Sequence, residues 1–353
     1  MNRVMALAEA GYIPDVALRF AIRRLCLARL RQEMRGGASA VEKRKQALAA
    51  SLASGPIAVH TEDANDQHYE VPAAFYGKVL GRFRKYSSGY WPEGVDDLDG
   101  AELAMLELSA ERAMVQDGQR ILDLGCGWGS MSLFLAERLP NAEILGISNS
   151  ASQREFILAE AGRRGLSNLD IVTADINDFE PELESRRFDR IVSIEMLEHV
   201  RNYSALFERM RRWLKEDGLA FVHIFCHHTV AYPFELDGDR DWMARHFFTG
   251  GMMPSVDFFE RFDRHLEVTD RWLVPGVHYE RTSNAWLDKL DAHRDELRPV
   301  LEATYGASQA ETYYHRWRLF FLACAELFGL RGGREWMVAH YRLRPKAAVS
   351  LAA

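Results

Sequence analysis

Hydrophobic and polar positions along residues 121–226 predict strands and helices in alternation. Short apolar runs predict strands at 121–124, 142–148, 169–174, 188–194 and 218–226. Apolar residues at helical spacing predict helices between them, at 131–139, 150–164 and 203–214. Because strands that alternate with helices form parallel sheets with right-handed crossovers, this pattern predicts an α/β fold.

The pattern changes on both sides of this region. Helical spacing recurs at 14–35, 41–52, 103–115, 283–296 and 309–328, and strands are predicted at 268–273 and 336–343. Together these elements predict a seven-stranded, mostly parallel sheet. Residues 64–72 and 85–91 are polar and aromatic without a clear period, which suits either pocket walls or packed loops. Residues 227–267 interrupt the alternation with aromatic, Met and Gly residues, and they are equally compatible with a lid and with a packing insertion.

A glycine turn follows the first strand of the alternating region. Gly125, Gly127 and Gly129 come directly after the apolar run that contains Asp123, and a helix is predicted next. Glycine lets a ligand approach the backbone closely, and a helix N-terminus offers free N–H groups. The spacing differs from G-x-G-x-x-G, and no phosphate-binding Lys follows. It resembles motif I of the S-adenosylmethionine (SAM) methyltransferases, in which the acidic residue orients the loop. The alternative is an ordinary strand-to-helix turn.

Polar side chains gather at the other predicted strand ends, where ligands of such sheets bind. Those ends carry Ser148-Asn149, Asp175-Ile176, residues 195–199 and His223. Within 195–199, Glu195, Glu198 and His199 are spaced to share one face. Two carboxylates and an imidazole can shift one another's pKa and act as general bases. No second His lies four residues from His199, so a zinc helix is excluded and no metal site is expected.

Charge and cysteine content narrow the functional classes. The net charge of -7 argues against a general nucleic-acid binder. The four cysteines stand alone, so neither a disulfide framework nor a zinc site is indicated. With no secretory segment or bilayer-spanning run, we expect a cytoplasmic protein. The basic helix at 14–35 either meets anionic phospholipid or, the better supported alternative, packs on the protein with its arginines in solvent.

A series of strings over roughly residues 60–343 resembles the cyclopropane-fatty-acyl-phospholipid synthase superfamily, and within it most closely the coclaurine-type N-methyltransferases. The strings are residues 65–72, 86–87, 122–129, 146–150 with Gln153, 193–199, 221–227, 232–235 and 241–251. The resemblance implies a Rossmann-like class I SAM methyltransferase fold with a helical N-terminal cap. We therefore expect residues 1–100 to form that cap with pocket loops, and residues 101–353 to form the SAM-binding domain, with 227–267 as a lid.

The resemblance also implies roles for single residues. It implies SAM contacts, with Asp123 orienting the loop, at Tyr86, Ser87, Asp123, Gly125, Gly127, Ser148, Asn149, Gln153, Asp175 and Ile176. In the lipid cyclopropanases, groups that match Glu198, His223 and Tyr279 hold a bicarbonate ion that serves as base. Two positions differ: Glu195 stands where those enzymes usually have Gly, and Ser88 stands where both branches often have Cys. Cys324 matches a nucleophile candidate of the family, although its apolar surroundings favour a core position.

The sequence thus predicts a SAM-dependent methyltransferase that acts on the nitrogen of a small, aromatic amine. Glu198 and His199 would accept the proton of the amine, Glu195 would anchor the cationic nitrogen, and aromatic side chains would add cation–π contacts. The alternative is modification of an unsaturated acyl chain at a membrane surface, with bicarbonate as base. A third class, a SAM-binding regulator without catalysis, leaves the Glu-His cluster unexplained. We also expect a homodimer.

Overall fold

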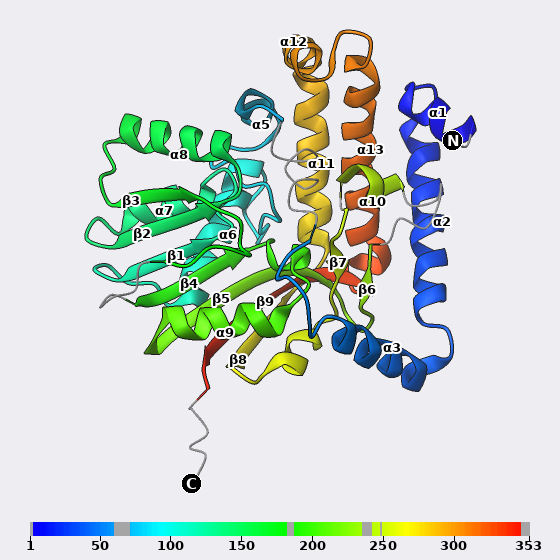
Figure 1. The fold of residues 1–353 in the computed structure, drawn as a ribbon. Coiled ribbons are helices and arrows are strands. Elements are labelled where there is room, and N and C mark those ends of the chain that lie inside the picture. Colours follow the sequence, from blue (N-terminus) through cyan, green and yellow to red (C-terminus); the bar gives the residue numbers. More distant parts are fainter. Residues whose placement is uncertain (1–2, 60–70, 182–186, 235–241, 248, 347–353) are drawn as a thin grey trace.

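A seven-stranded sheet forms one half of the molecule (Figure 1). The computed structural model describes residues 3–59, 71–181, 187–234, 242–247 and 249–346. The strands run in the order β3-β2-β1-β4-β5-β9-β8, and β9 is antiparallel to both of its neighbours. They are β1 (Arg120–Leu124), β2 (Glu143–Ser148), β3 (Leu169–Thr173), β4 (Phe188–Ile194), β5 (Leu214–His227), β8 (Leu266–Val274) and β9 (Trp336–Pro345). The predicted α/β fold with a mostly parallel sheet is confirmed.

Both faces of the central strands are covered. Ile121 packs with α6 (Leu98–Ala113) and α7 (Ser130–Arg138), and α8 (Ala151–Arg164) extends this layer. Its neighbours Leu122 and Leu124 point to the opposite face, toward α9 (Tyr203–Trp213) and the 3-10 turn η3 (Phe258–Phe262). Because successive side chains of a strand alternate between faces, a strand buried on both faces is a continuous apolar run. This is the reason the sheet could be read from the sequence.

A helical half stands beside the sheet. Helices α2, α11 and α13 lie side by side, with α12 across one end (Figure 1). The helices of this half are α1 (Arg3–Glu9), α2 (Asp15–Glu33), α5 (Ala73–Val79), α10 (Trp242–Phe247), α11 (Val277–Ala292), α12 (Arg294–Tyr305) and α13 (Ala310–Phe328). Helix α3 (Gly37–Ser51) leads back toward the sheet, where Lys45 Nζ lies 2.6 Å from the Asp257 carboxylate before η3. Segments from both ends of the chain therefore build this half; the domain boundary at residue 100 stays a prediction.

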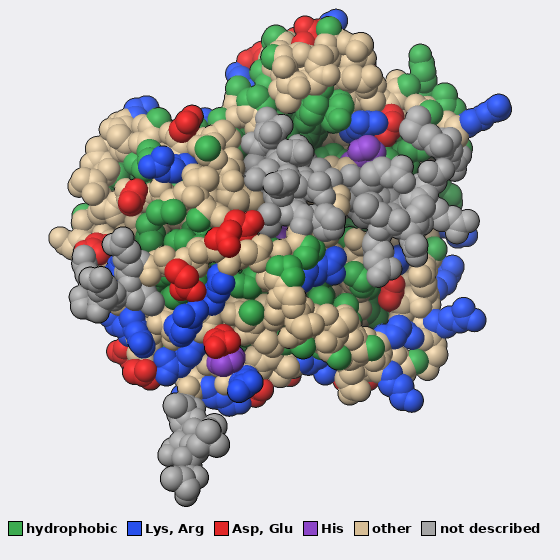
Figure 2. Space-filling view, viewed as in Figure 1, with side chains coloured by type: hydrophobic (Ala, Val, Ile, Leu, Met, Phe, Trp, Pro, Cys, Tyr) green, Lys and Arg blue, Asp and Glu red, His purple; other side chains and the backbone are tan. Residues whose placement is uncertain are grey.

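Helix α2 packs on the protein, as the better supported alternative predicted. Its buried residues Leu18, Cys26 and Leu30 join the core cluster shared with α13. Arg19 and Arg23 bind the buried carboxylate of Glu326 in α13, with Arg19 partly buried and Arg23 still exposed to solvent. Lys and Arg side chains gather along the edge of the molecule formed by α2 and α3 (Figure 2). None of the helices within the described ranges combines the length and apolar character needed to span a bilayer.

Several boundaries differ from the predicted ones, for local reasons. Strand β5 begins at Leu214 and not at 218, because its polar residues 215–217 fall in an irregularity of the pairing with β4. Helix α11 begins at Val277 and ends at Ala292, and a separate helix, α12, follows and contains Pro299, whose missing N–H removes one intrahelical hydrogen bond. Helices α5 and α10 lie in segments for which the sequence predicted no helix.

The insertion at 227–267 is well packed where it is described. Strands β6 (Tyr232–Pro233) and β7 (Met252–Met253) pair with each other, and Phe247 of α10 stacks on Phe320 at 4.2 Å. Its role as a lid stays a prediction. Residues 64–70, predicted as pocket wall or packed loop, lie outside the described residues.

Gly276, at the start of α11, packs closely against the backbone of β9 and of the end of α13, and its substitution should lower stability. A Cβ at this position would lie 2.1 Å from the carbonyl oxygen of Trp336 and 2.3 Å from that of Phe328. Gly276→Ala should therefore lower the free energy of unfolding by about 1–3 kcal/mol or more, measured by denaturant titration. The control is Gly162→Ala in exposed α8, where nothing lies within 4 Å; it should stabilise by about 0.5–1 kcal/mol. Equal effects of the two variants would contradict the packing described.

Candidate active site

A cavity opens where the carboxyl ends of β1, β2, β4 and β5 meet the helical half. The glycine turn after β1 and the ends of β2 and β4 line one side, and Tyr279, Trp286 and Phe320 from α11 and α13 line the other. This is the edge at which parallel sheets bind ligands. No described residue of the 227–267 insertion is among those that line it.

The glycine turn has the backbone shape that only glycine adopts without strain. Gly125, Gly127 and Gly129 all have positive φ, and a Cβ on Gly127 would meet no atom within 4 Å, so the backbone there borders open space. Asp123, buried beneath the turn, accepts a hydrogen bond from Ser132 Oγ at 2.5 Å. Burial raises the pKa of Asp123 to about 6. The turn can therefore admit a ligand against its backbone.

The end of β2 supplies polar groups to the same side of the cavity. Ser148 Oγ donates to Gln153 Oε1 at 2.6 Å, and Ser150 Oγ caps helix α8 by accepting the N–H of Gln153. Gln153 is fully buried, and within the described residues its Nε2 has no hydrogen-bond partner. A buried amide of this kind needs an acceptor, and the hydroxyl groups of an adenosyl ligand would supply one. These residues fit SAM.

Nearly all residues predicted to serve SAM line the cavity. They are Tyr86, Ser87, Asp123, Gly125, Gly127, Ser148, Asn149, Gln153 and Ile176. Asp175 is the exception, because its Oδ1 accepts the N–H of Asn177 at 2.7 Å and stabilises the turn after β3. Its neighbours Ala174 and Ile176 line the cavity in its place.

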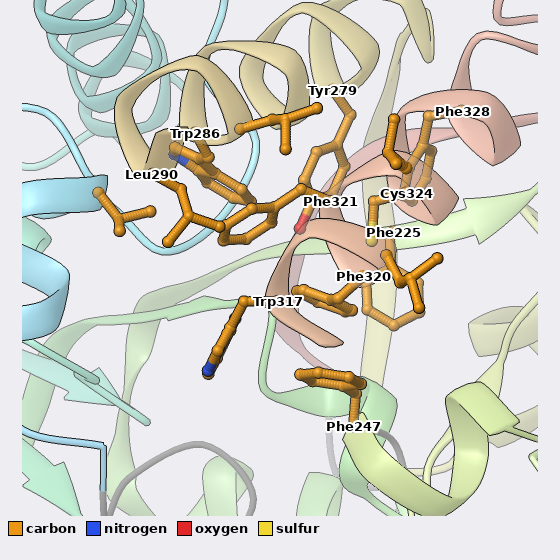
Figure 3. Packing of buried hydrophobic residues seen from close by; sticks show 14 of the residues in the cluster. Phe225, Phe247, Tyr279, Trp286, Leu290, Trp317, Phe320, Phe321, Cys324 and Phe328 are labelled. Carbon is orange, nitrogen blue, oxygen red and sulfur yellow. The ribbon is translucent and has the colours of Figure 1, made fainter. Parts of the chain in front are cut away.

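The opposite side of the cavity is aromatic. Tyr86, Phe225, Tyr279, Trp286 and Phe320 line it. Figure 3 shows how Tyr279 and Trp286 of α11 face Phe320 and Phe321 of α13. The sequence did not identify Trp286 and Phe320 as pocket residues, since helical spacing alone cannot separate a pocket wall from the core.

Glu195 is the carboxylate that faces this aromatic side. It adopts φ 48°, a left-handed conformation that is unusual for a residue other than glycine. Its Oε1 accepts the backbone N–H of Ser88 at 3.0 Å and lies 3.1 Å from His223 Nε2, and its Oε2 accepts Tyr279 O–H at 2.7 Å. Burial raises the pKa of Glu195, whereas Lys85 and the hydrogen-bond donors act in the opposite direction.

The same contacts decide whether bicarbonate fits. His223 and Tyr279, two of the three groups that the resemblance assigns to that ion, are directed at the Glu195 carboxylate. The third, Glu198, accepts the Phe225 N–H through Oε1 at 2.6 Å. A carboxylate of the protein thus occupies the donors, and the arrangement does not fit a separate bicarbonate ion.

Glu198 and His199 occupy different positions around Glu195. His199 lines the cavity, and burial lowers its pKa to about 4, although Glu195 opposes this shift. Its imidazole is therefore neutral at neutral pH, and burial makes it a weaker base, an effect that the nearby Glu195 partly offsets. Glu198 lies behind the cavity lining, and its buried Oε2 has no hydrogen-bond partner within the described residues. Burial, reinforced by Glu195, holds the pKa of Glu198 well above its usual value.

Two further buried residues lie close to this group. Cys324 is buried in α13 beside the aromatic cluster (Figure 3) and does not line the cavity. Burial raises the pKa of its thiol, which disfavours the nucleophilic thiolate. Lys85, which the sequence did not single out, is fully buried, and its Nζ donates to Ser87 Oγ and to the Ser88 carbonyl at 2.5 and 2.7 Å. It holds the loop that presents Ser88 N–H to Glu195.

Comparison with known proteins places this site in a family. The mycolic acid cyclopropane synthetase family model matches residues 58–333. The (S)-coclaurine N-methyltransferase of Thalictrum flavum subsp. glaucum is 36% identical over 347 residues, which covers 96% of this chain and 94% of that protein. The cyclopropane-fatty-acyl-phospholipid synthase of Escherichia coli (strain K12) is 30% identical over 283 residues, covering 78% and 67%.

A solved structure extends the similarity to the whole fold. The crystal structure of coclaurine N-methyltransferase bound to N-methylheliamine and SAH matches with a TM-score of 0.93 at 36% identity, covering 97% of this chain and 99% of that one. The cavity lies where a class I SAM methyltransferase binds its cofactor, and the residues there fit that cofactor. This chain therefore belongs to the mycolic acid cyclopropane synthetase family and is a SAM-dependent methyltransferase.

Proposed function

We propose that this enzyme transfers the methyl group of SAM to the nitrogen of a small aromatic amine. One observation carries the proposal: a buried carboxylate, Glu195, is fixed by three donors opposite an aromatic wall, beside the glycine turn that fits the cofactor. An anion at the edge of an aromatic cavity is complementary to a ring that bears a cationic nitrogen.

The backbone of Glu195 supports a functional role for its side chain. A residue other than glycine in the left-handed region costs about 1–2 kcal/mol, and such strain persists where the surroundings fix it, often at functional sites. Glycine, usual at this position in the lipid branch by the resemblance, would avoid that cost. Glu195 remains because its carboxylate satisfies Ser88, His223 and Tyr279 together.

The chemistry requires a neutral amine, since only the lone pair can attack the sulfonium methyl that SAM supplies. We propose that His199, which lines the cavity, accepts the proton of the amine, and that the adjacent Glu195 favours its protonated form against the effect of burial. Glu195 would hold the nitrogen while positive charge develops on it, and the aromatic walls would stabilise that charge and exclude water. Glu198, which does not line the cavity, would not contact the amine and would act only through its electrostatic effect on Glu195 and His199. Holding the amine nitrogen in line with the methyl group of SAM would supply much of the rate enhancement.

The relatives support the amine over the acyl chain. The relatives that are more similar to this chain than the lipid synthase are named as N-methyltransferases, among them pavine N-methyltransferase of Thalictrum flavum subsp. glaucum at 33% identity. The acyl alternative needs a bicarbonate base, and its expected donors already contact Glu195. The homodimer and the cytoplasmic location stay predictions.

The deciding experiment is incubation with methyl-labelled SAM and two substrate sets. Arylalkyl amines, including benzylisoquinoline-type secondary amines, should become labelled. Vesicles of unsaturated phospholipid should not, with or without added bicarbonate. Labelled lipid without labelled amine would overturn the proposal, and SAM binding without transfer to either set would favour the regulator alternative.

Cofactor binding is tested at the glycine turn. Gly127→Val would direct a branched side chain into the open space that the cofactor needs, so we expect calorimetry to show loss of SAM binding in a folded protein. Gly118→Val is the matched control: Gly118 also has positive φ and no atom within 4 Å, but it lies in the turn before β1. Both variants should lose stability, and only the first should lose SAM. Normal SAM affinity in folded Gly127→Val would refute the assigned site.

The anchoring carboxylate is tested by chemical rescue. Glu195→Gly should fold, because φ 48° suits glycine, and should lower kcat/KM for the amine about a hundredfold. Added formate or bicarbonate should restore part of that activity, since Ser88 N–H, His223 and Tyr279 would then be free to bind a small carboxylate.

Glu195→Gln is the control, because its amide fills the same space without charge and should not respond to either anion. Equal rescue of both variants, or rescue of neither, would show that the negative charge at this position is not what activity requires.

A further inference from the structure

Behind Glu195, a chain of hydrogen bonds runs through the sheet toward the surface. Glu195 Oε1 lies 3.1 Å from His223 Nε2, and His223 Nδ1 lies 3.1 Å from His340 Nε2. His340 Nδ1 lies 2.7 Å from a guanidinium nitrogen of Arg112 in α6. His223 of β5 and His340 of β9 are direct cross-strand partners, and both are fully buried.

The arginine gives this chain a direction. A guanidinium can only donate, so His340 Nδ1 accepts, and a neutral imidazole then carries its proton on Nε2. That proton is donated to His223 Nδ1, which leaves the proton of His223 on Nε2, facing Glu195. Burial, helped by Lys85 and Arg112, holds the pKa of both imidazoles well below the usual range, so both rings stay neutral. Each bond in the chain is therefore donated toward the carboxylate.

Arg112 contacts two groups, the His340 imidazole and the Trp272 ring. It is half-buried, and burial lowers its pKa. Among the described residues no carboxylate lies within ion-pair distance of it, although Tyr90 and Glu111 act on it electrostatically, and its guanidinium lies 5.1 Å from the Trp272 ring centroid. A partly desolvated arginine without a carboxylate partner is costly unless it serves another group. Here that group is His340.

We propose that Arg112 and His340 are positioning residues for the methyl transfer. They fix His223 as an N–H donor to Glu195 and thereby keep that carboxylate ionised in the orientation that holds the amine. This inference rests on the proposed function for its consequence in catalysis, whereas the tautomers it assigns can be tested without any substrate.

The other groups around Glu195 determine whether its pKa rises or falls when the relay is broken. Lys85, the Ser88 N–H and Tyr279 favour the ionised form, His199 faces it from the turn after β4, and Glu198 is a like charge when ionised. Burial favours the protonated form. Losing the donated proton of His223 would remove one of the opposing contributions, so the pKa of Glu195 would rise further and the carboxylate would stay protonated to higher pH.

The first experiment reads the tautomers directly. In enzyme labelled with ¹⁵N-histidine, long-range ¹H–¹⁵N spectra should show His223 and His340 as neutral rings with the proton on Nε2, assigned through His223→Gln and His340→Gln. In Arg112→Met, His340 should show a mixture of tautomers or the Nδ1–H form. A proton on Nδ1 of either histidine in the unmodified enzyme would overturn the proposal, whatever the substrate proves to be.

The second experiment measures kcat/KM for the amine against pH in Arg112→Met and Arg112→Lys. In Arg112→Met, the fall of kcat/KM at low pH should begin about one pH unit higher than in the unmodified enzyme. At pH values below that point, KM for the amine should be about tenfold higher. The kcat at saturating amine and the SAM affinity should change little. Titration of the amine itself is common to all variants and cancels in the ratio. Arg112→Lys keeps a cationic donor and should restore most of the profile.

Arg342→Met is the matched control, because Arg342 lies 5.5 Å from the same Trp272 ring but pairs with Asp270 instead of His340. It should leave the pH profile in place even if stability falls. An unshifted acid limb in Arg112→Met, or an equal shift in Arg342→Met, would show that Arg112 is merely structural. If no amine is methylated at all, the proposed function fails, and the tautomer measurement still decides the relay.

Discussion

The arrangement of the site depends on one buried carboxylate that must be satisfied. A carboxylate placed among aromatic side chains is strongly unfavourable unless several donors converge on it. Glu195 draws these donors from three separate parts of the chain: the loop at 85–89, strand β5 and helix α11. Each of these elements also lines the cavity or supports a residue that does. The requirement to pair this single charge therefore joins the sheet half of the molecule to the helical half.

The two halves contribute different chemistry to the cavity. The sheet ends in backbone turns and small polar side chains, which suit a polar cofactor that must be approached closely. The helical half contributes rings fixed by mutual packing, such as Tyr279 stacked on Phe328 at 4.3 Å. Rigid rings give an acceptor little freedom to turn, so its nitrogen can be presented to the methyl group in one orientation.

Glu195 is the position at which this chain differs from the lipid branch, as the resemblance has it. In that branch, glycine leaves room for an external anion among the same donors. Here a side chain supplies the anion permanently, at the cost of a left-handed backbone. A covalently held carboxylate cannot leave with a proton as bicarbonate can, which suits an anchor better than a base that must be exchanged. His223 and His340 continue the hydrogen bonds of this carboxylate into the sheet.

The sequence by itself determined the sheet, the glycine turn and most of the cofactor side. These features arise from local signals: an apolar run buried on both faces, glycines that must adopt positive φ, and a capped helix at Ser150. Residue spacing pointed to Glu195, Glu198 and His199, and the family resemblance added His223 and Tyr279, which it grouped with Glu198 as holders of an ion and not as partners of Glu195. Only the tertiary structure decided that His223 and Tyr279 bind Glu195, that Asp175 is engaged by its own turn, and that Arg112 reaches His340 from 228 residues away. Contacts of that kind depend on which strands become neighbours and on the register in which they pair, and neither is encoded in the local pattern of the chain.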